Sequence, residues 1–190
     1  MPGPRTINVS MKKSVLLSLL LLSIAFANAQ VYATRNGFIG FYSKTPLENI
    51  KAENKQVYAG IDVAKKNIAF NLLVKGFSFN KKLMQDHFNE EYIESDKYPN
   101  ARFSGTYTGD VDVTRDGTYN VQAQGQLTLH GVTKPIEVPA VIEVKDGKLI
   151  GKSDFKLTPS DFNIKIPSLV REKIAQQIDV HVSIDCSAIK

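Results

Sequence analysis

The 190-residue sequence has no tryptophan, three histidines and a single cysteine, and each scarcity narrows the possible sites. One cysteine cannot form an internal disulfide, so no disulfide framework is expected. Cys186 stands near the end of the last expected strand, where we expect it to pack as a small apolar residue rather than act as a nucleophile. The sequence also lacks G-x-S-x-G, P-loop and dinucleotide-binding motifs. No motif therefore indicates a serine hydrolase, a nucleoside triphosphatase or a dinucleotide-dependent enzyme.

The three histidines give little support for a metal site. His87 and Glu90 could share one helical face, but a catalytic zinc site usually needs three protein ligands, and the familiar helical histidine pairs are absent. His130 and His181 are expected on the polar faces of two different strands. The other carboxylates near His87 are expected to form a solvated helix face rather than an acid/base pair: Glu91, Glu94 and Asp96. We therefore expect no metal, no cofactor and no catalytic residue.

The N-terminus has the features of a secretory signal peptide. Lys12 and Lys13 precede the apolar run "SVLLSLLLLSIAFANA", and Ala27-Asn28-Ala29 suits a signal peptidase, which makes Gln30 the first mature residue. The apolar core is short for a membrane span. We therefore expect a signal peptide over 1–29, with Met11 an alternative start that would leave 1–10 outside the gene, and one domain over 30–190. Export to the periplasm is expected, and full secretion is the alternative.

Little charge remains once the signal peptide is removed. The whole chain carries +5, but three of its basic residues precede Gln30, and 21 basic against 19 acidic residues leave a net charge of +2. This balance gives no indication of nucleic-acid binding. No transmembrane span is expected in the mature chain, and the sequence does not indicate an oligomeric state.

Apolar and polar residues alternate along most of the mature chain, which is typical of half-buried β-strands. Gly-containing turns at 115–117 and 145–147 separate some of these runs. About eight strands are expected: 36–43, 56–63, 68–77, 101–113, 119–131, 136–144, 149–157 and 178–185. Strands joined in order by short loops can close into an up-and-down antiparallel barrel, although periodicity alone also fits a sandwich.

Two segments depart from this alternation and predict short helices. A helix is predicted over residues 80–95, with Asn80 as its N-cap. A shorter helix is predicted over residues 167–176, with Pro167 near its start. An apolar stripe runs along the first helix: Leu83, Met84, Phe88 and Tyr92. Such a stripe predicts a helix that packs against the barrel or over one of its ends.

Two sequence elements, in this order, resemble the YceI-like family of polyisoprenoid-binding-like proteins. The first is Lys97-Tyr98-Pro99-x-x-x-Phe103, and the second runs from Gly125 through Leu127-Thr128 and Gly131-Val132-Thr133-Lys134-Pro135. "FSF" at 77–79 and "DFNI" at 161–164 also look like the family. The chain departs from it in the first strand, where "RNGFIGFYS" replaces a family pattern that begins with histidine.

The resemblance implies a mainly β fold, an eight-stranded antiparallel lipocalin-like barrel with two short helices. It also implies that the apolar interior holds a polyisoprenoid-type lipid, and that no cofactor is needed. The residues expected to line this interior are Phe41, Phe70, Leu72, Val74, Phe77, Phe79, Phe103, Tyr107, Leu127, Leu129, Val138, Ile142, Phe155, Leu157 and Phe162.

The favoured function is therefore an exported, non-enzymatic carrier or sequestering protein for a hydrophobic lipid. Two alternatives remain open at this point. The same residues could fill a solid core in a protein-interaction or stress-response module, or the barrel could be an enzyme acting on a lipophilic substrate. Eight-stranded barrels exist in both filled and ligand-holding forms, so the pattern of inward residues does not separate these cases.

Overall fold

Eight long antiparallel strands form the wall of the molecule in the computed structural model, which describes residues 31–189. The expected signal peptide and its cleavage point lie outside these described residues. The strands are β1 (Val31–Lys44), β2 (Asn49–Asp62), β3 (Asn67–Leu73), β5 (Asn100–Thr108), β6 (Gly117–Leu129), β7 (Val132–Lys145), β8 (Lys148–Leu157) and β9 (Ile178–Ile189). A two-residue strand, β4 (Ser78–Phe79), pairs with β2.

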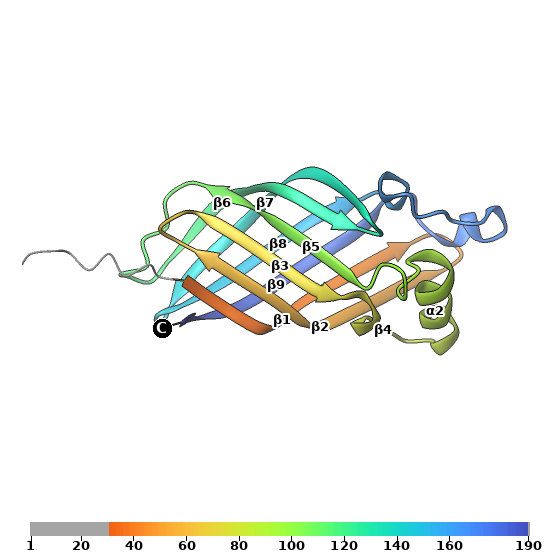
Figure 1. Cartoon of the computed structure of the whole chain (residues 1–190), viewed down its shortest axis with the longest axis horizontal. Helices are drawn as coiled ribbons and strands as arrows, with labels where there is room; N and C mark the ends of the chain where they lie inside the picture. The colour runs from red at the N-terminus through yellow and green to blue at the C-terminus, as the bar shows by residue number, and fades with distance from the viewer. Residues whose placement is uncertain (1–30, 190) are drawn as a thin grey trace, which may run out of the picture.

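The sheet closes on itself. Its order is β1-β9-β8-β7-β6-β5-β3-β2, and β1 pairs in turn with β2 along almost its whole length (Figure 1). Closure satisfies the backbone groups of both edges, which an open sheet would leave exposed. The prediction of an eight-stranded antiparallel barrel is confirmed.

The helical segments lie at one end of the barrel. The expected helix over 80–95 consists of α2 (Lys82–His87) followed directly by a π-helical turn, η2 (Phe88–Tyr92). Its N-cap is Lys81, so the assignment of Asn80 was wrong. The second expected helix is present as a 3₁₀ segment, η4 (Ser168–Lys173), which follows Pro167 in an extended conformation. Two more 3₁₀ turns interrupt the chain, η1 (Val74–Gly76) and η3 (Pro159–Phe162).

The ladder between β7 and β8 is incomplete. β7 pairs with β6 over almost its whole length, from Val132 at the turn between them to Val144. Its pairing with β8, in contrast, runs from Lys145 only as far as Val141, which lies opposite Lys152. The hairpin closed by Lys145 and Lys148 makes the odd-numbered residues of β7 direct their backbone groups toward β8. Pro135 and Pro139 are two of those residues, and proline has no N–H to donate. β7 and β8 therefore separate toward the end that carries the helices.

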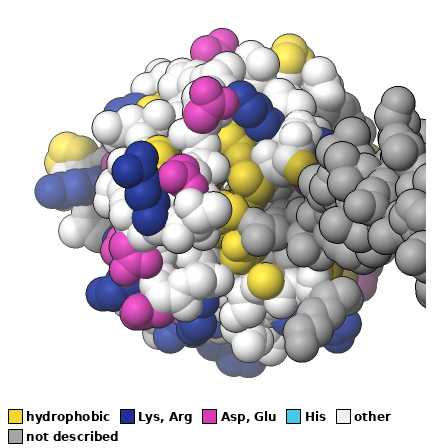
Figure 2. All heavy atoms as spheres, turned by 90° about the vertical axis from the view of Figure 1, so that its left-hand side faces the viewer, with side chains coloured by type: hydrophobic (Ala, Val, Ile, Leu, Met, Phe, Trp, Pro, Cys, Tyr) yellow, Lys and Arg dark blue, Asp and Glu magenta, His cyan; other side chains and the backbone are white. Residues whose placement is uncertain are grey.

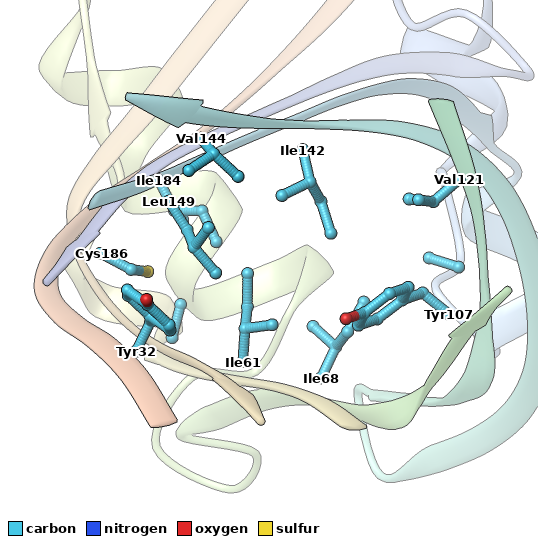
Figure 3. Close-up of a cluster of buried hydrophobic side chains, with 12 residues drawn as sticks. Tyr32, Ile61, Ile68, Tyr107, Val121, Ile142, Val144, Leu149, Ile184 and Cys186 are labelled. Carbon is cyan, nitrogen blue, oxygen red and sulfur yellow. The ribbon is translucent and has the colours of Figure 1, made fainter. Parts of the chain in front are cut away.

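The opposite end of the barrel is filled. Inward side chains from the strands pack together there in one apolar cluster (Figure 3): Tyr32, Ala59, Ile61, Ile68, Tyr107, Val121, Ala123, Ile142, Val144, Leu149, Ile184 and Cys186. Cys186 is fully buried, and burial raises the pKa of its thiol to about 12, so it stays a neutral packing group as expected. From outside, this end shows charged side chains of both signs around a small group of hydrophobic ones (Figure 2).

Two glycines let β5 and β6 approach each other closely. Gly105 and Gly125 are directly opposite in the ladder, and a Cβ on Gly105 would overlap the carbonyl oxygen of Gln124. The obstacle is backbone, so it cannot be relieved by moving a side chain.

We expect Gly105→Ala to lower the free energy of unfolding by about 1–3 kcal/mol, because the two strands must move apart. Gly60→Ala is the matched control, since the nearest atom to its added Cβ lies 3.9 Å away. Denaturant unfolding of both variants checks this. Equal stabilities of the two variants would contradict the close approach.

Candidate functional site

The helical end of the barrel is hollow. It holds a cavity of about 540 Å³, which is within the usual range of small-molecule sites, roughly 300–1,000 Å³. All eight long strands contribute inward side chains to its wall. The cavity lies along the half in which the ladder between β7 and β8 is incomplete, and it reaches Val141 and Lys152, the last pair of that ladder.

The structure brings most of the predicted lining residues together. On the cavity wall lie Phe41, Phe70, Leu72, Val74, Phe77, Phe79, Phe103, Leu127, Leu129, Val138, Ile142, Phe155 and Leu157. Two predicted residues lie elsewhere. Tyr107 shares the inward face of β5 with Phe103, but it stands in the filled half and packs in the apolar cluster there. Phe162 is buried in η3, outside the cavity wall.

Four phenylalanines attach the helical segment to the barrel. Phe88 of η2 lies with its ring centre 5.6 Å from that of Phe41 on β1, 5.8 Å from Phe77 and 5.1 Å from Phe79. These tilted and edge-on contacts add to the burial of the rings. They place α2 and η2 over the hollow half (Figure 1).

Sequence reasoning missed part of the wall. The stripe on the first helix was assigned to packing, yet Leu83, Met84, Phe88 and Tyr92 all line the cavity. The segment around η4 contributes four more apolar residues, which were not predicted: Ile164, Ile166, Val170 and Ile174. Ile164 and Ile166 alternate with polar residues in "FNIKIP", and this alternation could have indicated that both side chains face the cavity.

The cavity meets the surface between three segments. Its exposed or half-exposed lining residues there come from the β1–β2 turn (Glu48), from α2 and the residue before it (Lys81, Leu83) and from η4 (Lys173). We call this opening the mouth. Lys81 forms an ion pair with Glu48 at 3.1 Å across it. The other charged lining residues, Arg102 and Lys152, are also exposed, so no charge is buried in the apolar wall.

A model of the YceI-like domain matches residues 28–186. The chain belongs to the YceI-like family. A UPF0312 protein of Pseudomonas putida is 35% identical over 101 residues, which cover 50% of this chain and 48% of the relative. Protein YceI of Shigella flexneri is 31% identical over 101 residues with the same coverage. The chain thus spans about half the length of the curated relatives it matches.

Solved structures share the YceI-like fold. A polyisoprenoid binding domain from Saccharophagus degradans, implicated in plant cell wall breakdown, superposes with a TM-score of 0.70 at 14% identity, covering 85% of this chain and all of the other. BcnA of Burkholderia cenocepacia gives 0.66 at 15% identity, covering 80% of this chain and 96% of the other. At these identities the likeness concerns the fold.

The two YceI-like sequence elements meet in space. The ring of Tyr98, from the first element, packs edge-on against His130, from the second, with 4.5 Å between ring centres. Gly131 has a φ of +71°, and a side chain there would collide with Tyr98. The two elements therefore form a single junction in the folded chain.

His130 links three chain segments at this point. Its side chain is buried, not on a polar strand face as the alternation suggested. Nδ1 lies 3.0 Å from the carbonyl oxygen of Phe162 in η3, and Nε2 lies 2.9 Å from a carboxylate oxygen of Glu94, just after η2. Both partners are acceptors, so only the imidazolium form donates to both. The junction therefore ties the residues just after η2 and the 3₁₀ turn η3 to the β6–β7 turn.

The hydrogen bond from His130 holds the pKa of Glu94 below its ordinary value of 4.5, with a smaller contribution from Lys97. A carboxylate whose pKa is lowered by folding stabilises the native state above its ordinary pKa. That stability is lost as the pH falls through the lowered value.

We expect Glu94→Gln to lower the melting temperature at neutral pH. Its difference from the unaltered protein should shrink as the pH falls below 4.5 through the lowered pKa of Glu94, because the carboxylate of the unaltered protein then becomes neutral as well. Thermal unfolding across this range is the measurement, with Glu90→Gln, an exposed glutamate of η2, as the control. A difference that stays constant with pH would rule out a role for the charge of Glu94.

Proposed function

We propose that this protein is a non-enzymatic carrier or sequestering protein that holds a hydrophobic, polyisoprenoid-type lipid in the cavity of its barrel. The observation that carries the proposal is the apolar cavity itself, walled by inward residues of all eight long strands. Among the described residues, one end of the barrel has the solid core that the filled-barrel alternative requires, whereas at the other end the buried cluster around Leu72, Val74 and Phe77 borders the cavity.

Apolar burial alone can hold such a ligand. Each Å² of apolar lipid surface removed from water contributes roughly 25 cal/mol. The charged lining residues are exposed, so the chain of the lipid meets hydrocarbon along the wall while a polar head can stay at the mouth. The Saccharophagus domain, described as polyisoprenoid-binding, supports the ligand class through its shared fold.

Binding is favoured over catalysis. Within residues 31–189, no three side chains of His, Cys, Asp or Glu are grouped so as to hold a metal ion. Among the predicted chemical candidates, His87 reaches the cavity, whereas Glu90 and Glu91 are exposed and do not line it. His87 alone offers no paired acid and base, so a binding role is the simpler account of the cavity.

We also propose that the protein is exported, with the periplasm as its compartment and secretion as the alternative. The support is the signal-peptide pattern over 1–29 together with membership of the YceI-like family. In the described part of the chain, no helix is both long and apolar enough to cross a membrane.

Two neighbouring leucines provide a matched test. Leu72 points into the cavity and is 4% exposed, whereas Leu73 points outward and is 58% exposed. We expect Leu72→Trp to reduce binding of a C40 polyprenol at least tenfold, because about 1.4 kcal/mol of lost contact has that effect. Leu73→Trp should bind as the unaltered protein does. Native mass spectrometry of each protein with the polyprenol measures the bound fraction.

The fold of each variant is checked by thermal unfolding, and Leu129→Trp, on β6, is a second cavity substitution in case Leu72→Trp does not fold. Unchanged polyprenol binding in a folded cavity variant would exclude the cavity as the lipid site. Loss of binding in Leu73→Trp would point to the outer surface instead.

A further inference from the structure

The mouth carries exposed leucines. Leu47, in the β1–β2 turn, is 61% exposed, Leu83 of α2 is 65% exposed, and Leu169 of η4 is 92% exposed. Each comes from a different one of the three segments that border the mouth. Single exposed leucines are common on protein surfaces, but a group around the opening of an apolar cavity indicates an interaction surface.

Two contacts join the three segments that carry these leucines. The ion pair between Lys81 and Glu48 joins the start of α2 to the β1–β2 turn. The backbone N–H of Ala175 donates to the hydroxyl of Ser43 at 2.8 Å, which joins the end of the η4 segment to β1. Figure 1 shows the three segments together at the same end of the barrel.

The same three segments are basic. Over 43–50, 80–87 and 164–176 the basic residues are Lys44, Lys81, Lys82, Lys165, Arg171 and Lys173. The acidic ones are Glu48, Asp86 and Glu172, which leaves six positive against three negative charges, a net +3. Glu90 and Glu91 follow on η2, and including them lowers the excess to +1. The mature chain as a whole is expected to carry only +2, so the three segments that border the mouth are more basic than the rest of the mature chain.

We propose that the mouth docks on the surface of a bilayer that contains anionic lipids, so that the lipid passes between bilayer and cavity without crossing water. The leucines enter the interface, and the basic residues are attracted to the acidic headgroups at its surface. A bilayer suits this site better than a protein that covers the mouth, because the docked partner must itself supply or accept the lipid. This inference rests on the proposed lipid-binding function.

Vesicle flotation tests the docking. The protein without its expected signal peptide (residues 30–190, which keep every described residue) is mixed with vesicles of phosphatidylcholine, either pure or with about one-third phosphatidylglycerol. We expect it to float with the anionic vesicles, and to do so less at high salt, because salt screens the headgroup contacts.

The double variant Leu47→Glu/Leu169→Glu should reduce flotation at least about tenfold, because both exposed leucines lie outside the cavity wall and their apolar surface is what enters the interface. The matched control is Ile189→Glu, a residue at the far end of the barrel that is 55% exposed, which should float as the unaltered protein does. Thermal unfolding confirms that each variant is folded.

Three results would overturn the docking surface. The first is that the protein does not float with anionic vesicles, and the second is that Ile189→Glu reduces flotation as much as the double variant does. The third is that the protein is a dimer that the double variant abolishes, because the leucines would then join two copies of the chain. Uptake of the C40 polyprenol from ethanol separates this proposal from the function it rests on. A double variant that still takes up polyprenol but does not float supports docking, whereas flotation without any uptake overturns the lipid-binding function.

Discussion

Closure of the sheet through the β1–β2 ladder is the constraint on which the rest of the structure depends. A closed eight-stranded sheet has an interior of limited width, and inward side chains either fill it or leave room for one ligand. This barrel does both along its length. Tyr32, Tyr107 and the surrounding aliphatic residues fill one half. Toward the other end β7 and β8 separate, and the same inward alternation lines a cavity instead.

A hollow end needs a cover, and the chain builds it from segments outside the strands. The phenylalanine contacts of Phe88 bring α2 and η2 against β1 and β4, while the η4 segment closes from the side of β8 and β9. His130 connects both covers to the β6–β7 turn through Glu94 and Phe162. The contact between the two YceI-like elements, Tyr98 against His130, therefore belongs to the attachment of the cover, whereas most of the cavity wall comes from plain alternating strands.

Much of this was predictable from the sequence, because side chains alternate strictly across a strand. The eight strands, the closed barrel and most of the wall follow from that alternation and the family resemblance. Alternation could not separate Phe103 from Tyr107, since both point inward from β5 and only their packing partners on other strands place one at the cavity and the other in the filled cluster. Pro135 and Pro139 were the visible signal that the ladder between β7 and β8 is incomplete. Burial of His130 could not be read from its own strand, because its partners lie 36 and 32 residues away along the chain.

The proposed carrier function requires above all that the hollow half of the barrel holds a lipid. The most direct measurement is mass spectrometry of an organic extract of the protein, purified without detergent from the cell that naturally makes it. The account predicts an isoprenoid chain in near-stoichiometric amount, absent from an extract of the Leu72→Trp variant prepared in the same way. An extract free of lipid, together with an experimental structure in which side chains fill the space between Phe41, Leu129 and Phe155, would contradict it.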